Sequence, residues 1–167
     1  AKSYKPRLWL AIALPIFLVE GFYNLLTNID ILFVSYFLPP APVGVYCAAA
    51  KTLRCEKMTV VGGNDVKGAT QAEMHERITA GLKLAAPIAE REGVMLILEP
   101  MNIRVDHKGH CLYGSEAAVR ICRAVASPMV KVNWDLYHCH ISEGDLCGHL
   151  REGFDQLGYA QIADHPG

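Results

Sequence analysis

Oxygen-bearing side chains stand at the ends of three short apolar segments of this chain. Glu99 follows five apolar residues and precedes a proline, Asp135 ends a second such segment, and Gln161 lies in a third. A short apolar run bounded by glycine and proline is typical of a strand buried on both faces of a parallel sheet. The carboxyl ends of the strands carry the chemistry in α/β barrels. We therefore expect Glu99, Asp135 and Gln161 to converge around one cation at a barrel rim.

Each of these residues also has an ordinary interpretation. Glu99 could be an exposed glutamate in a loop, although a carboxylate after so apolar a run is desolvated and must be paired, metal-bound or protonated. Asp135 and His138 form an Asp-x-x-His pair that could be two turn residues. Gln161 stands between apolar neighbours, and such an amide is most often a hydrogen-bonded core residue.

A second cluster of histidines and cysteines follows the Asp-x-x-His pair. Its members are His138, Cys139, His140, Cys147 and His149. Zinc can bind such residues, but these spacings match none of the usual structural zinc patterns. We therefore give this zinc hypothesis little weight.

Strand and helix patterns alternate from residue 58 to the end of the chain. Strands are expected at 58–63, 94–99, 130–135 and 159–164, and helices at 71–91, 115–126 and 143–154. Thr70 and Ser115 are the expected N-caps, and Pro87 should kink the first helix or break it near Leu84. The alternation predicts an α/β fold with a parallel sheet. About four strands in 55–167 amount to a partial (β/α)₈ TIM barrel that starts and stops in mid-fold.

Composition and charge narrow the class of protein. Of the 167 residues, 51% are hydrophobic and 20% charged, which excludes a disordered chain. The formal net charge of −1 gives no reason to expect nucleic acid as a partner. The six cysteines show no paired spacing and are interpreted as reduced thiols that mostly pack in the interior.

The first 54 residues differ in character from the remainder. Residues 8–38 carry only two charges, Glu20 and Asp30, and are long enough to cross a membrane, with basic residues before them. A proline-rich turn ends this segment, and residues 43–50 are expected to begin another helix. The region resembles one transmembrane segment of the bacterial polysaccharide flippases in Trp9, Leu14-Pro15, Gly21, Asn28, Asp30 and 43–46. A generic membrane anchor and a buried core helix are the alternatives, and we expect 1–54 to be unrelated to 55–167.

Residues 58–167 resemble the hydroxypyruvate isomerases and, more broadly, the xylose isomerase-like sugar isomerases and epimerases. Five motifs carry the resemblance, in the same order and at compatible spacing: Glu99 to Asn102, Arg104 to His107 with Gly109, Asp135 to His138, Glu143 to Asp145, and Gln161 to Asp164 with Pro166-Gly167.

The resemblance implies a metal-dependent isomerase or epimerase that acts on a small hydroxy-carbonyl compound or sugar. With its reduced thiols the barrel part is expected to be cytoplasmic, and the chain to be membrane-associated if residues 8–38 form a true membrane segment. It makes Glu99, Asp135 and Gln161 ligands of Mg²⁺ or Mn²⁺, Glu99 also one of two catalytic glutamates, and His138 and Asn102 substrate-binding residues. The metal would polarise the carbonyl group, and one carboxylate would remove the adjacent proton to give an enediolate.

The chain also departs from this family. The second glutamate of the family lies on a last strand beyond Gly167, and Tyr159 stands where the family often has histidine. We therefore expect the chain as written to be inactive, and its open half-barrel to be able to self-associate. Alternatives are a fragment of a membrane transporter, a non-catalytic barrel remnant, and a zinc-dependent endonuclease, which would need more histidine ligands and a basic groove.

Overall fold

The computed structural model describes residues 40–163 and 165. In chain order the elements are α2 (Pro40–Thr52), β1 (Lys57–Val61), α3 (Gln71–Glu92), β2 (Met95–Glu99), α4 (Ser115–Val125), β3 (Val130–Asp135), α5 (Leu136–Ser142), α6 (Leu146–Gly153), the 3₁₀ turn η1 (Phe154–Gln156) and β4 (Leu157–Gln161).

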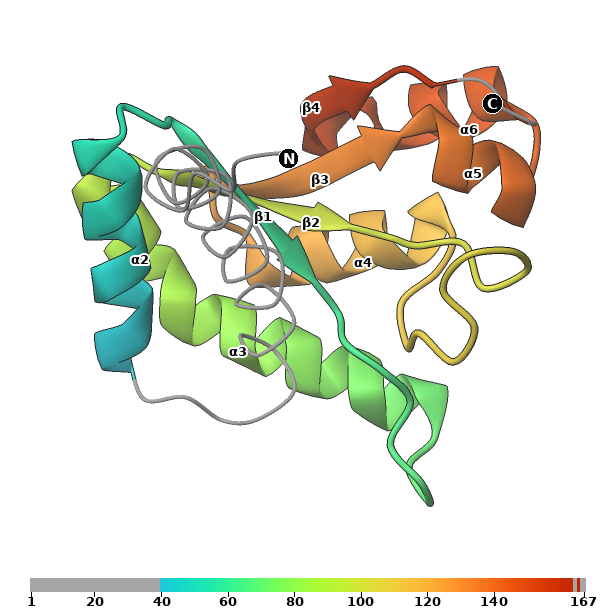
Figure 1. The fold of residues 1–167 in the computed structure, drawn as a ribbon, viewed down its shortest axis with the longest axis horizontal. Coiled ribbons are helices and arrows are strands. Elements are labelled where there is room, and N and C mark those ends of the chain that lie inside the picture. The colour runs from blue at the N-terminus through green and yellow to red at the C-terminus, as the bar shows by residue number, and fades with distance from the viewer. Residues whose placement is uncertain (1–39, 164, 166–167) are drawn as a thin grey trace, which may run out of the picture.

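The four strands form one parallel sheet in the order β1-β2-β3-β4, so each strand pairs with the next one in the chain. Helices α3 and α4 lie along one face of this sheet (Figure 1). Alternate residues of the central strands, among them Leu96, Leu98, Val132 and Trp134, are buried against these helices. The expected α/β fold with about four parallel strands is confirmed.

Helix α3 is a single helix of 22 residues, and the expected break near Leu84 is wrong. Thr70 caps it as expected: its side chain accepts a hydrogen bond from the Glu73 amide, and Glu73 reaches back to the Thr70 amide. Pro87 leaves the carbonyl of Lys83 without its helical partner. Both residues are on the exposed side of α3, where water can hydrogen-bond that carbonyl, while the apolar side stays packed on the core.

Helix α4 begins differently from the expectation. Ser115 is the first residue of the helix and not its cap. Gly114 holds the N-cap position, and it has no side chain that could accept a capping hydrogen bond. The amide of Ser115 instead donates to the carboxylate of Glu143, with both oxygens 3.0 Å away. The cap of α4 therefore comes from a residue 28 positions later in the chain.

The region after β3 holds one helix that the sequence pattern did not predict. Helix α5 starts directly after Asp135, and the expected helix 143–154 is the shorter α6 followed by η1. Strand β4 ends at Gln161, not at residue 164. The cause at α5 is local: Asp135 is both the last residue of β3 and the N-cap of α5, accepting from the Tyr137 amide at 2.9 Å.

Residues 8–38, the expected apolar helix, lie outside the residues that the structure describes. Among the described residues, no helix is long and apolar enough to cross a membrane. The helix expected at 43–50 is present as α2, with prolines in its first turn, where they are tolerated. Cys47 and Ala50 of α2 are buried in the same core as α3. The domain boundary at residue 54 stays a prediction, as does self-association of the half-barrel.

Candidate metal centre

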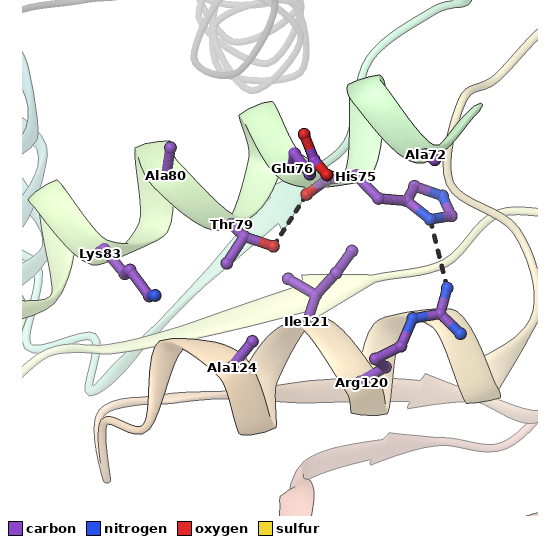
Figure 2. A pocket seen from close by; sticks show the side chains of 9 residues that line it. All are labelled: Ala72, His75, Glu76, Thr79, Ala80, Lys83, Arg120, Ile121 and Ala124. Atoms are coloured by element: carbon purple, nitrogen blue, oxygen red, sulfur yellow. Dashed lines mark hydrogen bonds between the residues drawn. The ribbon is translucent and has the colours of Figure 1, made fainter. Parts of the chain in front are cut away.

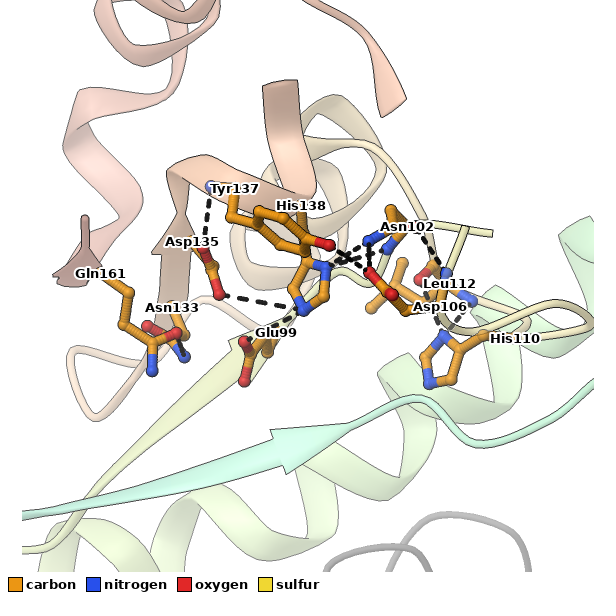
Figure 3. A network of polar contacts seen from close by, with 10 residues as sticks. All are labelled: Glu99, Asn102, Asp106, His110, Leu112, Asn133, Asp135, Tyr137, His138 and Gln161. Atoms are coloured by element: carbon orange, nitrogen blue, oxygen red, sulfur yellow. Dashed lines mark hydrogen bonds and ion pairs between the residues drawn. The ribbon is translucent and has the colours of Figure 1, made fainter. Parts of the chain in front are cut away.

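The register of the sheet brings polar side chains together at its carboxyl edge. Asp135 is paired with Gln161 across β3 and β4, so their side chains leave the sheet on the same face. Glu99 ends β2 and follows the Leu98–Val132 pair, which points to the helices. Because side chains alternate along a strand, Glu99 points to the other face, and Figure 3 shows it beside Asp135 and Gln161.

Glu99 and Asp135 are in contact with the end of the Gln161 amide. One amide atom lies 3.1 Å from Oε1 of Glu99 and 3.3 Å from Oδ2 of Asp135. With nitrogen in that place, the amide donates to both carboxylates. With oxygen there, the amide accepts from Nδ2 of Asn133 at 3.0 Å, and three oxygens converge. A cation between them would balance the second arrangement, so the amide can serve the site with or without a metal.

His138 joins this group from the first turn of α5. Its Nε2 lies 3.8 Å from Oδ2 of Asp135 and 4.0 Å from Oε1 of Glu99. Among the described residues, Glu99, Asp135 and His138 are the one group of three or more His, Cys, Asp or Glu side chains close enough to hold a metal ion. Burial of the ring, more than any other cause, lowers the pKa of His138, which favours the neutral imidazole.

Asn102 lies behind His138, in the loop that follows β2. It is fully buried, and its side-chain amide contacts the ring at Nδ1, 2.8 Å away. The same amide donates to Asp106 at 2.8 Å, and the Tyr137 hydroxyl donates to the same Asp106 oxygen, also at 2.8 Å. Both hydrogen bonds lower the pKa of the Asp106 carboxyl. The residues expected to bind substrate thus belong to one network with the metal-site carboxylates (Figure 3).

Sequence reasoning missed roles for Asn133, Asp106 and Tyr137. Asn133 is fully buried on β3 and donates to the Gln161 amide oxygen. Asp106 accepts from the Asn102 amide, and the Tyr137 hydroxyl donates to the same Asp106 oxygen. Asp106 and Tyr137 stand inside the motifs that carried the resemblance, which was the available signal. Asn133, a polar residue inside a buried apolar strand, was a signal of the same kind as Gln161.

The second histidine–cysteine cluster does not form a site. Within the part of the chain that the structure describes, His140, Cys147 and His149 are not in any group that could hold a metal ion. All six cysteines are free thiols.

A groove of about 420 Å³ lies elsewhere, between α3 and α4 (Figure 2). It shares no residue with the strand-end group. Both ring nitrogens of its histidine, His75, contact other residues: Nε2 contacts the carbonyl of Cys111 at 3.1 Å, and Nδ1 lies 3.5 Å from Nη2 of Arg120. The convergent carboxylates, amide and imidazole are at the sheet edge, and this edge is the candidate site.

Comparison with known proteins identifies the family of the chain. The family model described as "Xylose isomerase-like TIM barrel" matches residues 45–167. The chain belongs to this family. Hydroxypyruvate isomerase from Escherichia coli is 29% identical over 117 residues, which cover 70% of this chain and 45% of that protein. The 2-oxo-tetronate isomerase from Cupriavidus necator is 32% identical over 111 residues, covering 66% and 42% respectively.

Solved structures show a similar arrangement of strands and helices. The crystal structure titled "AP endonuclease, family 2" from Brucella melitensis matches with a TM-score of 0.65 and 26% identity, covering 72% of this chain and 46% of that one. The chain thus spans less than half the length of these relatives. The expected resemblance to an isomerase and epimerase family is confirmed, whereas the resemblance of residues 1–54 to flippases has no support.

Proposed function

We propose that this chain carries part of the active site of a divalent-metal-dependent isomerase for small hydroxy-carbonyl compounds. The observation that carries the proposal is the convergence of Glu99, Asp135 and Gln161 at three strand ends, with the His138 imidazole beside them. Relatives named as isomerases of hydroxypyruvate and 2-oxo-tetronate support the reaction class and the kind of substrate.

The donor set fits a hard cation. Glu99, Asp135 and Gln161 offer oxygen ligands, which Mg²⁺ and Mn²⁺ prefer. Adjacent ligands on an octahedral ion with bonds of about 2.1 Å are about 3.0 Å apart. The Gln161 atom lies 3.1 Å and 3.3 Å from the two carboxylates, which is close to that spacing. A bound cation would polarise the carbonyl of the substrate and the neighbouring hydroxyl group.

The protein's own groups supply binding and proton transfer. Glu99 is only 7% exposed and lies at the end of β2, close to Asp135 and His138. It removes the proton from the carbon next to the substrate carbonyl, which gives an enediolate. His138 donates a hydrogen bond to a substrate oxygen from the side of α5. Asp135 keeps its direction because its Oδ1 accepts from the Tyr137 amide, which leaves Oδ2 for the site.

Metal binding is the first test. Calorimetric titration of the 167-residue chain with Mn²⁺ is expected to show one site, and Asp135→Asn to weaken binding about tenfold or more. Asp155→Asn is the matched control, because Asp155 is exposed and pairs with Arg123 at the far end of β4. Equal Mn²⁺ affinity in all three proteins would overturn the metal centre.

Proton abstraction is tested by hydrogen exchange on the substrate. Hydroxypyruvate in D₂O should exchange its C3 protons for deuterium faster with the chain and Mg²⁺ than with Mg²⁺ alone, measured by proton NMR. This half of the reaction needs one base, so Glu99→Gln should lower the rate about 10²–10⁴-fold. Exchange that persists unchanged in Glu99→Gln would remove Glu99 from the proposed role.

A further inference from the structure

We infer that Asn102 is a positioning residue that fixes the tautomer of His138, so that this histidine presents a hydrogen-bond donor to the site and is kept out of the metal-ligand set. The inference rests on the proposed function for its meaning in catalysis. The hydrogen bonds that carry it are properties of the folded chain alone.

The orientation of the Asn102 amide is unambiguous. Its Oδ1 accepts the backbone N–H groups of Val105 and Asp106, each at 3.1 Å. Two N–H donors require an oxygen between them, so Nδ2 must be on the opposite side of the amide. Nδ2 lies 2.8 Å from Oδ2 of Asp106 and 2.8 Å from Nδ1 of His138. All the hydrogen-bonding groups of this side chain are therefore used within the protein.

The Asn102 contact decides where the proton of His138 is. An amide nitrogen has two hydrogens to donate and no capacity to accept. Nδ1 of His138 must therefore offer its lone pair to Asn102, and the backbone amide of Asn102 points to the same atom at 3.4 Å. A neutral imidazole carries one proton, which is then on Nε2. That nitrogen is the one that faces Asp135 and Glu99.

This arrangement is the reverse of what a metal-binding histidine needs. A histidine that ligates a metal through one nitrogen usually donates the N–H of the other nitrogen to a carboxylate or a carbonyl. His138 meets a donor at Nδ1, so its Nε2 keeps a hydrogen and has no lone pair for a cation. Although Glu99, Asp135 and His138 are close enough to hold an ion, the ligands left to it are oxygens from Glu99, Asp135 and Gln161.

Asp106 and Tyr137 support the same assignment. The Asp106 carboxylate accepts from both Asn102 and the Tyr137 hydroxyl. Without this acceptor one N–H of the buried Asn102 amide would have no partner. Tyr137 and His138 are neighbours on α5, so this helix holds the ring directly and also, through Asp106, the amide that orients it.

The test exchanges the hydrogen-bond donor at position 102 with the acceptor at position 106. In Asn102→Asp/Asp106→Asn, the new carboxylate at 102 can still accept from the two loop amides and from the new amide at 106. It cannot donate to His138, so Nδ1 must present an N–H to it, and the neutral ring then has its lone pair on Nε2. Asp106→Asn alone is the matched control, since the donor at Asn102 stays in place.

Nitrogen-15 NMR of the histidine-labelled chain reads the tautomer directly, and His138→Gln identifies the signal among the seven histidines. The expected result is Nε2–H in the wild type and in the control, and Nδ1–H in the double variant. Nδ1–H in the wild type, or the same tautomer in wild type and double variant, overturns the inference. Asn102→Asp alone takes the place of the double variant if circular dichroism shows that the latter is unfolded.

Metal selectivity is the second readout. The double variant should bind Zn²⁺ more tightly relative to Mg²⁺ than the wild type does, by about tenfold or more, because zinc favours an imidazole ligand. An unchanged Zn²⁺ to Mg²⁺ ratio overturns the inference. Neither measurement uses a substrate or turnover. A chain with Nε2–H that does not exchange the C3 protons of hydroxypyruvate therefore argues against the isomerase alone, and a chain with Nδ1–H that does exchange them argues against the role of Asn102 alone.

Discussion

Glu143 caps a helix to which it does not belong: both oxygens of its carboxylate lie 3.0 Å from the backbone nitrogen of Ser115 at the start of α4. Glu143 itself is the C-cap of α5. This contact joins the helix that carries His138 to the helix that supports β2 and β3 from behind. Gly114 leaves room for it, since a Cβ at that position would lie 3.3 Å from Oε2 of Glu143.

Loss of this cap should destabilise the whole domain. Glu143→Ala is expected to lower the free energy of unfolding by about 0.5–2 kcal/mol, because the buried Ser115 loses the acceptor of its N–H group. Glu143→Gln keeps an acceptor oxygen and should cost less. Glu116→Gln is the control, as it removes a carboxylate from the same first turn without contact to Ser115. Urea unfolding followed by circular dichroism measures all three, and equal midpoints for Glu143→Ala and the control would contradict the cap.

Two glycines in helices should respond to alanine with opposite signs. A Cβ at Gly153 would lie 2.6 Å from both Trp134 and Val119, so Gly153→Ala should destabilise by about 1–3 kcal/mol. Gly81 in α3 has nothing within 4 Å of a Cβ, and Gly81→Ala should stabilise by about 0.5–1 kcal/mol. Thermal unfolding of the two variants compares the same chemical change in two surroundings. A stabilising Gly153→Ala would show that α6 packs less closely on the sheet than described.

Glu99→Gln should stabilise the chain without metal and weaken its response to metal. Glu99 and Asp135 are two carboxylates in a partly buried group, and removing one charge relieves their repulsion. The metal-free melting temperature should rise by about 2–4 °C for each kcal/mol gained. Saturating Mg²⁺ should instead raise the unfolding free energy of the wild type. The gain is about 2.7 kcal/mol when the Mg²⁺ concentration is 100 times the dissociation constant. Scanning fluorimetry with EDTA or Mg²⁺ checks both, with the exposed Glu56→Gln as control. A lower metal-free melting temperature in Glu99→Gln would contradict the repulsion.

The thiols should react in two classes. Cys55 and Cys147 are exposed, whereas the other four cysteines are buried. Burial raises the pKa of Cys111 to about 11 and that of Cys122 to about 12. Because the thiolate is the reacting form, two thiols should be labelled quickly at pH 8 and the remaining four only after unfolding. Cys55→Ser/Cys147→Ser should remove the fast phase in a colorimetric thiol assay. Fast labelling of more than two thiols would contradict the burial of the others.

The sequence predicted the strands of this fold better than its helix ends. Strands β2 and β3 are apolar segments with clear boundaries, so the positions of Glu99 and Asp135 followed from pattern alone. The break expected near Leu84 does not occur because Pro87 is on the side of α3 that meets water, and no local pattern specifies that side. The cap of α4 by Glu143 joins residues 28 positions apart, and a search for local capping signals cannot find it.

The candidate site was only partly accessible to sequence reasoning. Glu99, Asp135 and Gln161 were expected together because parallel strands end at one edge. Asn102 and His138 were expected to bind substrate, and that role stays a prediction for both. The hydrogen bond between them could not be foreseen, since it depends on how the loop after β2 folds back over the first turn of α5.

The order of the strands in the sheet also governs how the site is completed during synthesis. Each described strand pairs with its chain neighbour, so the sheet can grow in the order in which the ribosome delivers it. Glu99 emerges first, Asp135 follows and Gln161 comes last. The 62 residues from 99 to 161 take roughly 3 to 12 s to synthesise at about 5–20 residues per second. For those seconds the nascent chain holds only one or two of the three proposed ligands, so tighter retention of a cation would accompany the arrival of β4.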